Sequence, residues 1–304
     1  MGDVRYYIDK YPAPAVSFTP DANFPVSFAE KGVCRGFITS GPILENICDF
    51  RGGLAKNAVA DRAEATVRCQ RELSPAEGLE VEKTGDGLWH LTAHGVSRHA
   101  CTPQRSVNAI GVLARYLLAN RIPAEGEARF LEFLLPLLSE IHGESYGLVR
   151  KDDVFPGSLT LIGGTMETDG KRLVQSFDCR YVTGMSSEEV IGQLAACAGD
   201  IAEVTLFEDE PVYNIGPDNP AIQLCYELCR EYRDDGRAPY ASVGGTYARH
   251  MPNAFAFGPQ YFKPEAPDFV GAIHARNEGI HKEQLKLAAK IYTAALLALQ
   301  ELDY

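Results

Sequence analysis

The sequence lacks any run of apolar residues long enough to cross a membrane, since no stretch approaches eighteen consecutive apolar side chains. The segment from Met1 to Tyr6 has no apolar core of the signal-peptide type. No cysteine pair has the C-x-x-C spacing, although the chain has 8 cysteines. Basic residues are fewer than acidic ones: the chain has 29 Lys and Arg and 41 Asp and Glu, which gives a formal net charge of −12. We therefore expect a cytoplasmic protein with reduced thiols that binds neither nucleic acid nor an anionic membrane.

The overall composition is that of a globular protein. Of its 304 residues, 45% are hydrophobic and 23% are charged, which predicts a packed core and two domains. Residues 3–10 predict the end of a helix that Pro12 and Pro14 stop. Residues 15–18 and 26–28 predict two short buried strands.

From about residue 33 to residue 213 the pattern changes to hairpins and helices. Alternating segments flank Gly85-Asp86-Gly87 and again Thr168-Asp169-Gly170, and both patterns predict hairpins. Ser106 is placed to cap one helix, and Ser186 with Glu189 has the spacing of a capping box for another. These elements predict a sheet with two helices on one face.

After Asn214 the pattern becomes helical again. Pro220 is suited to the first turn of a helix, on which Cys225 and Cys229 share one face and are better explained as core residues than as ligands. A strand over 254–257 and a long helix over 283–302 complete the chain. Alternating strands and helices of this kind predict an α/β fold.

Four features favour chemistry, and each also has a plainer explanation. Asp21 lies in a loop between two predicted strands, where an Asx turn is the simpler interpretation. His99 lies between a strand and a helix, where a histidine is usually solvated. The Gly-rich loop from Gly244 to Arg249 matches no nucleotide-binding motif, and it would either hold an anion or form a tight turn. His274 follows a strand-like stretch and suits zinc, but zinc needs three or four ligands.

Seven short motifs follow one another along the chain. They are Phe18-Thr19-Pro20-Asp21-Ala22-Asn23-Phe24-Pro25 with Glu30-Lys31-Gly32, the stretch from Gly52 to Asp61, Gly95 to Pro103 with Asn108-Ala109, Asp178-Cys179-Arg180-Tyr181, Gly244 to Arg249, Ala256-Phe257-Gly258-Pro259, and His274 to Glu278. In this order they resemble the co-catalytic zinc exopeptidases of the aminoacylase and carnosinase superfamily. Within it they resemble the Xaa-His dipeptidase branch of the PepV and Sapep type, essentially from end to end of the chain.

The resemblance implies a metal site and an oxyanion site. Asp21 resembles a ligand of one zinc ion and His274 a ligand of the other, in a site of two ions that Mn²⁺ or Co²⁺ would also suit. His99 is similar to the histidine that reaches the substrate carbonyl and stabilises the oxyanion.

The resemblance also implies residues that hold the substrate, a dipeptide. Asn57 and Arg180 resemble such residues, and Arg180 would pair with the terminal carboxylate, which the planar guanidinium matches. The loop that contains Gly244, Gly245, Thr246 and Arg249 would help to hold the peptide backbone or the same carboxylate.

The domain organisation follows from the resemblance together with the order of the elements. Residues 1–32 and 216–304 would form part of an α/β metallopeptidase catalytic domain that holds the metal. Residues 33–215 would form an inserted α+β lid that binds the substrate.

Several metal ligands of that superfamily have no counterpart in the sequence. None of the 7 histidines is followed two positions later by Asp, so the His-x-Asp motif with the bridging carboxylate is missing. The only adjacent glutamates, Glu188-Glu189, lie in the predicted capped helix and do not replace the Glu-Glu pair that supplies the base. A two-metal site needs both groups. The sequence therefore predicts an N-terminally truncated chain that is inactive without the missing segment.

The predicted function is metal-dependent hydrolysis of dipeptides. One alternative is a non-catalytic remnant or a peptide-binding or interaction module. Another is an N-acyl-amino-acid amidohydrolase of the same superfamily. The Thr-Pro-Asp-Ala and Gly-Gly-Thr-Tyr-Ala-Arg runs favour the dipeptidase branch.

Overall fold

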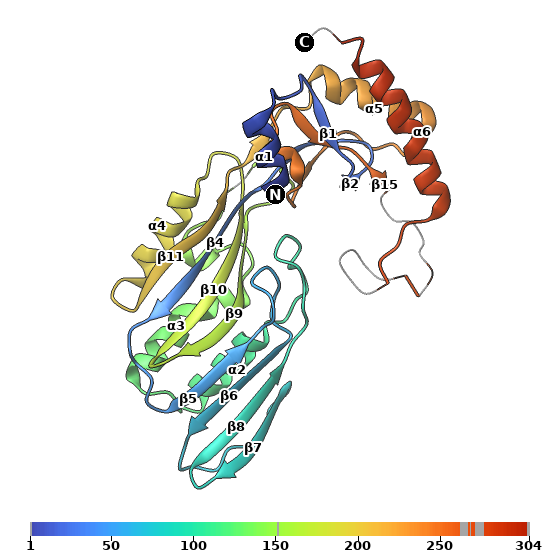
Figure 1. Cartoon of the computed structure of the whole chain (residues 1–304). Coiled ribbons are helices and arrows are strands. Elements are labelled where there is room, and N and C mark those ends of the chain that lie inside the picture. The colour runs from blue at the N-terminus through green and yellow to red at the C-terminus, as the bar shows by residue number, and fades with distance from the viewer. Residues whose placement is uncertain (1, 151, 262–266, 268, 271–276, 303–304) are drawn as a thin grey trace. The chain divides into compact units, whose positions relative to one another are not determined.

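The computed structural model describes residues 2–150, 152–261, 267, 269–270 and 277–302, and the chain divides into two compact units. The terminal unit joins both ends of the chain, Met1–Lys31 and Val212–Tyr304, and the central unit is the continuous segment Gly32–Pro211. The architecture is mixed α/β, with six α-helices and two larger sheets among the described residues (Figure 1).

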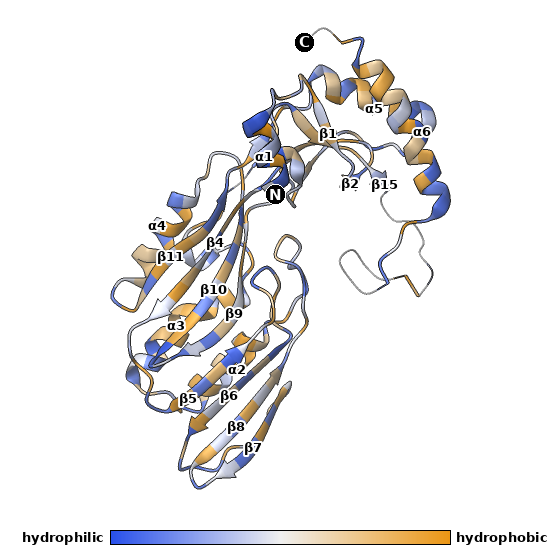
Figure 2. Ribbon diagram, in the orientation of Figure 1, coloured by the Kyte–Doolittle hydropathy of each residue, from blue (hydrophilic) through white to orange (hydrophobic). Residues whose placement is uncertain are grey.

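The central unit is built on an eight-stranded antiparallel sheet with the order β11-β4-β10-β9-β5-β6-β8-β7. Its strands are β4 (Gly32–Ser40), β5 (Ile47–Gly52), β6 (Arg62–Arg68), β7 (Leu79–Gly85), β8 (Leu88–His94), β9 (Thr160–Asp169), β10 (Arg172–Tyr181) and β11 (Ala202–Glu210). Both predicted hairpins, β7–β8 and β9–β10, are confirmed. Hydrophobic and hydrophilic residues alternate along the strands (Figure 2), as a sheet with two different faces requires.

Helices cover one face of this sheet. They are α2 (Ala109–Ala119), α3 (Glu125–Ser139) and α4 (Ser187–Ala198), which pack on β6 and β8, on β9 and on β11 respectively (Figure 1). On this covered face, a Cβ at Gly163 would lie 2.7 Å from the Cδ2 atom of Leu138 in α3. Because side chains alternate along a strand, Arg35 and Phe37 of β4 lie on the opposite face, which we call the open face.

The start of α2 differs from the sequence prediction. The cap is Asn108, whose side-chain oxygen accepts the N–H of Ile110 at 3.0 Å, and Ser106 is not the cap. The cause is a pair of main-chain hydrogen bonds between Val96 and Val107, of 2.8 and 3.1 Å, which keeps residue 107 extended. The predicted cap of α4, Ser186, is confirmed.

Helix α3 was not predicted at all. Its N-cap position is Ala124, which offers no side-chain cap, and Pro136 lies inside it, so the usual sequence signals are missing. The fully buried carboxylate of Glu127 stabilises the helix start instead. It accepts main-chain N–H groups of Glu45, Ile47 and Ala124 at 2.7, 2.8 and 2.7 Å. A partner some eighty residues away in the chain cannot be recognised from local sequence.

The terminal unit contains a mixed sheet with the order β1-β14-β3-β12, in which β13 also pairs with β3. Its strands are β1 (Ser17–Thr19), β3 (Ser27–Glu30), β12 (Tyr213–Asn214), β13 (Tyr240–Ser242) and β14 (Ala254–Ala256), and β2 (Ala22–Asn23) pairs separately with β15 (Pro259–Gln260). The helices are α1 (Gly2–Lys10), α5 (Pro220–Tyr232) and α6 (Lys282–Leu299). β1 and β14 run parallel, so the two ends of the chain form one sheet.

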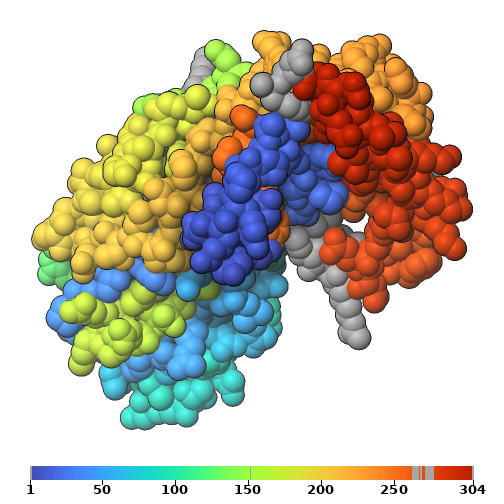
Figure 3. Space-filling model, turned by 45° about the horizontal axis from the view of Figure 1, so that its top comes forward, coloured from blue at the N-terminus to red at the C-terminus, as the bar shows by residue number. Residues whose placement is uncertain are grey.

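Aromatic rings join α6 to this sheet. The ring of Tyr292 lies 5.6 Å from that of Phe18 and 5.7 Å from that of Phe257, and its hydroxyl donates to the Phe257 carbonyl oxygen at 2.9 Å. The other side of α6, red in Figure 3, lies at the surface. Among the described helices, none combines the length and the apolar character that a membrane span needs.

Cys225 and Cys229 both lie in the core, as their spacing predicted. Burial raises the pKa of the Cys225 thiol to about 12, so this thiol stays protonated at neutral pH.

The core of the central unit can be tested with the single tryptophan. Trp89 lies on β8, which packs against α2, so its fluorescence reports the unfolding of this unit. We expect Leu113→Ala, at a fully buried position of α2, to lower the free energy of unfolding by about 2–5 kcal/mol in urea. Leu54→Ala is the control, because Leu54 is 99% exposed and its loss should cost at most about 0.5 kcal/mol. Similar costs at both positions would contradict the assignment of α2 to the core.

Candidate functional site

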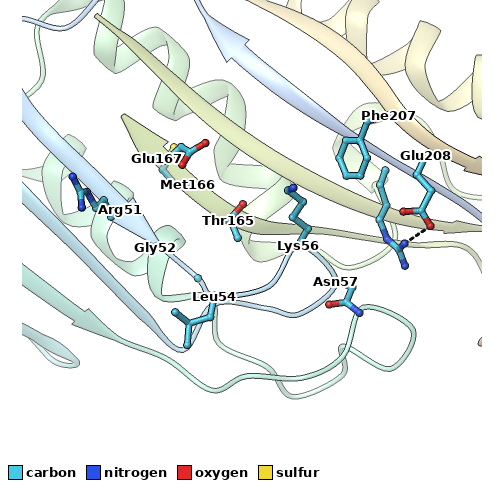
Figure 4. A pocket seen from close by; sticks show the side chains of 12 residues that line it. Arg51, Gly52, Leu54, Lys56, Asn57, Thr165, Met166, Glu167, Phe207 and Glu208 are labelled. Carbon is cyan, nitrogen blue, oxygen red and sulfur yellow. Dashed lines mark hydrogen bonds and ion pairs between the residues drawn. The ribbon is translucent and has the colours of Figure 1, made fainter. Parts of the chain in front are cut away.

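A pocket of about 660 Å³ lies on the open face of the central unit's sheet. The side chains that line it (Figure 4) come from four strands and from the loop after β5, and include Arg35, Arg51, Lys56, Asn57, Thr165, Met166, Glu167, Phe207 and Glu208. This loop crosses β9 very closely, because a Cβ at Gly164 would lie 2.3 Å from the carbonyl oxygen of Lys56. Gly164 therefore allows the loop to form one wall of the pocket.

A row of alternating charges crosses the open face near the pocket. The fully buried carboxylate of Asp178 accepts from Nε and Nη2 of Arg180 at 2.7 and 3.1 Å, and from Nε of Arg35 at 2.5 Å. Arg35 also donates through Nη1 to Glu208 on β11. Burial lowers the pKa of the Arg35 guanidinium, but Asp178 and Glu208 outweigh it and the net shift is upward.

Arg180 is thus held by Asp178 along one edge of its guanidinium. The remaining nitrogen, Nη1, has no hydrogen-bond partner among the described residues. The side chain is 5% exposed, so the group is fixed rather than solvated. Such a guanidinium keeps both N–H groups of Nη1 for an incoming acceptor.

Lys56 is held above two aromatic rings. Its Nζ lies 5.1 Å from the ring centre of Phe37 and 5.0 Å from that of Phe207, and these rings are 4.9 Å apart. No carboxylate in the described part of the chain forms an ion pair with Lys56. This cation–π arrangement leaves a positive charge at the pocket wall.

His99 lies in the connection between β8 and α2, beside the loop that carries Asn57. Main-chain hydrogen bonds join the two segments: the N–H of Ala100 donates to the Asn57 carbonyl at 2.9 Å, and that of Val59 donates to the Arg98 carbonyl at 2.9 Å. His99 Nε2 then lies 3.3 Å from Asn57 Nδ2. On the other side of the ring, Nδ1 lies 2.9 Å from Sγ of Cys101 and accepts the Cys101 main-chain N–H at 3.2 Å.

The loop from Gly244 to Arg249 lies in the terminal unit and surrounds a buried carboxylate. The Glu30 side chain is buried, with the residue 1% exposed. Its carboxylate accepts hydrogen bonds from the N–H of Thr246 at 3.0 Å, from the hydroxyl of Thr246 at 2.5 Å and from Nε of Arg249 at 2.9 Å. Arg249 Nη2 donates to the carbonyl of Lys31 at 2.8 Å. Its Nη1 is buried and has no partner among the described residues. Gly245 leaves room for the guanidinium in this position, because a Cβ would lie 2.8 Å from Nη2 of Arg249.

The two predicted metal ligands are not equally described. Asp21 lies in the turn between β1 and β2 with an exposed side chain, whereas His274 lies outside the described residues. Within the described ranges, which omit 271–276, no three His, Cys, Asp or Glu side chains group as metal ligands.

Comparison with known proteins gives two kinds of match. No family model matches the chain. Over 94% of its length the chain is 27% identical to the "Putative dipeptidase" of Staphylococcus epidermidis, and equally to "Putative dipeptidase SACOL1801" of Staphylococcus aureus. The chain resembles dipeptidases along nearly its whole length. The resemblance inferred from its motifs is thereby confirmed. The chain spans 64% of the length of these curated relatives.

Solved structures also align with the chain. The crystal structure of human carnosine dipeptidase 1 aligns at 11% identity, with a TM-score of 0.45, over 94% of this chain and 60% of that one. A tripeptidase from Staphylococcus aureus aligns at 13% identity, with a TM-score of 0.45, over 96% of this chain and 59% of that one.

The structure brings some of the predicted residues together and adds others. Asn57 and His99 are neighbours in the central unit, and Thr246 and Arg249 are neighbours in the terminal unit. The additional residues are Asp178, Glu30 and Cys101. All three lie within or beside the quoted motifs, but only the fold shows that they contact Arg180, Arg249 and His99.

The buried position of Asp178 can be tested against its neighbour Glu208, since both contact Arg35. Asp178→Asn leaves two largely buried guanidinium groups without their shared carboxylate, and we expect a loss of about 3–5 kcal/mol in unfolding free energy. Glu208→Gln removes a carboxylate whose side chain is 37% exposed and should cost about 1 kcal/mol or less. Urea unfolding followed by Trp89 fluorescence measures both. Equal losses would show that Asp178 is not the main stabilising charge.

Proposed function

We propose that this chain is part of a dipeptidase that hydrolyses dipeptides with the help of metal ions. One observation carries the proposal: 94% of the chain aligns, at 27% identity, with a curated protein named as a dipeptidase. Because the chain spans 64% of that relative, the activity is proposed for a complete catalytic site and is not assigned to these 304 residues alone.

In this proposal the central unit is the lid that holds the substrate. His99 would donate a hydrogen bond to the carbonyl oxygen of the scissile bond, where negative charge develops, and Asn57 beside it would hold the peptide. Arg180 would use Nη1 for the terminal carboxylate of the dipeptide. The support for this role is the guanidinium's fixed plane, since its other edge is already engaged by Asp178.

The Gly-rich loop of the terminal unit has a narrower role in the proposal than the sequence suggested. Thr246 and most of Arg249 are engaged by Glu30 and the Lys31 carbonyl. A substrate contact from this loop would therefore use Nη1 of Arg249, the buried donor that lacks a partner among the described residues.

Metal dependence is proposed on the resemblance, with Asp21 and His274 as ligands and zinc, manganese or cobalt as the metal. The described residues do not fit a metal centre by themselves, because they bring no three ligand side chains together. A metal centre therefore requires further ligands. The substrate contacts proposed above are all made directly by protein side chains. A segment with the His-x-Asp and Glu-Glu ligands is the proposed partner.

The proposed location is the cytoplasm. All 8 cysteines are free thiols in the structure, four of them in the core, which suits a reducing compartment.

Hydrolysis of a small dipeptide panel, with added zinc or manganese, tests the proposal. We compare the 304-residue chain with a longer chain that also carries a relative's His-x-Asp and Glu-Glu segment. The longer chain should turn over dipeptides and the 304-residue chain should not, because a site without bridging carboxylate and base lacks both the held water and its proton acceptor. Asp21→Ala should abolish the activity of the longer chain. Robust turnover by the 304-residue chain that Asp21→Ala removes would show that its ligand set is already complete.

The panel also separates the alternatives. Preference for N-acyl amino acids would favour the amidohydrolase, and peptide binding without turnover in either chain would favour a binding module.

In the active longer chain, His99→Gln should lower kcat by about 10²–10³ with little change in KM. His94→Gln is the matched control, since His94 is an exposed strand residue paired with Glu80 at 3.2 Å. Equal effects of both substitutions would contradict the role of His99.

A further inference from the structure

The two ring nitrogens of His99 have contacts that require opposite tautomers. Nδ1 accepts the main-chain N–H of Cys101 at 3.2 Å, and Nε2 lies 3.3 Å from Nδ2 of Asn57, which is also a donor. A neutral imidazole has one N–H and one lone pair. If Nε2 accepted from Asn57, Nδ1 would carry the proton and direct it at the N–H of Cys101. Only one of the two contacts can be a hydrogen bond in this orientation of the amide.

The main-chain contact decides between the tautomers because it cannot be reversed. A peptide N–H is always a donor. A half-turn of the Asn57 side-chain amide, in contrast, exchanges oxygen for nitrogen in the same space. The main chain at Cys101 is also fixed by a turn, since the N–H of Thr102 donates to the His99 carbonyl at 2.9 Å. This reasoning makes Nδ1 the acceptor and places the proton on Nε2, and it requires the Asn57 amide to be turned so that Oδ1 replaces Nδ2 opposite Nε2.

We propose that Cys101 is the positioning residue of His99, and that its main-chain N–H and its thiol together hold the neutral ring in the Nε2–H tautomer. Sγ lies 2.9 Å from Nδ1, so the S–H is a second donor to the same lone pair. Transfer of the thiol proton to Nδ1 would set two N–H groups against each other. In this arrangement the thiol is a donor to the Nδ1 lone pair of His99.

The tautomer determines what His99 offers to a ligand. In the assigned tautomer Nε2–H is directed at Asn57, which lines the pocket on the open face. This step rests on the proposed function: in a dipeptidase, the carbonyl oxygen of the substrate would replace Oδ1 of Asn57 as the acceptor. The other tautomer would present a lone pair to the developing oxyanion and repel it.

The tautomer can be measured directly on the 304-residue chain. With ¹⁵N-labelled histidine, long-range ¹H–¹⁵N correlations distinguish a protonated from an unprotonated ring nitrogen, and His99→Gln identifies the signals of His99. At a pH where the ring is neutral, we expect Nδ1 unprotonated and Nε2 protonated. Cys101→Ala keeps the main-chain N–H but loses the thiol, and should move the tautomer ratio toward Nδ1–H by about two- to tenfold. Cys101→Ser, which restores a donor, should restore the ratio.

Cys48→Ala is the control, because Cys48 is a half-buried thiol of the same unit, on β5, and should leave the ratio unchanged. A predominant Nδ1–H form in the unmodified chain, at a pH where the ring is neutral, would overturn the proposal. A Cys101→Ala ratio equal to that of Cys48→Ala would overturn the role of the thiol. The unmodified chain alone tests the tautomer, so a variant that fails to fold does not remove the test. The spectra need neither metal nor turnover, so an inactive longer chain would sink the proposed function without touching this result.

Discussion

The fully buried carboxylate of Asp178 is the charge on which the open face of the central sheet depends. Two guanidinium groups converge on it, one from the adjacent strand β4 and one from two residues further along β10. Removing a carboxylate from water is costly unless its partners are charged and hydrogen-bonded, and here both conditions are met. In return the carboxylate fixes the planes of Arg35 and Arg180. The substrate role proposed for Arg180 is available only because Asp178 holds it in one orientation.

The terminal unit repeats this arrangement with different residues. Glu30 is buried at the end of β3 and binds Thr246 and Arg249, which lie more than two hundred positions later in the chain. In both units a buried carboxylate engages one part of an arginine, and Nη1 is left without a partner among the described residues. A guanidinium held in this way keeps its direction when a ligand carboxylate arrives, so little side-chain entropy is lost on binding.

The contacts of His99 follow the same logic on a smaller scale. The Cys101 main chain provides a donor whose direction cannot change, and the side chains around it adapt to that donor. Local sequence does not reveal this, because a histidine two residues before a cysteine is compatible with several turns. The contact with Asn57, forty-two positions earlier, further depends on how the loop after β5 crosses β9 at Gly164.

The sequence by itself determined the elements whose signals are local: the β7–β8 and β9–β10 hairpins, the Ser186 cap of α4, and the burial of Cys225 and Cys229. Its motifs in order also identified the resemblance to dipeptidases and the candidate residues. Only the tertiary structure decided that α3 exists, that Asn108 starts α2, and which carboxylates hold Arg180 and Arg249. The reason is physical: turns and caps form between neighbours in the chain. A buried charge instead selects whichever partners the fold brings within hydrogen-bond distance. Such partners lie about eighty residues from Glu127 and more than two hundred residues from Glu30.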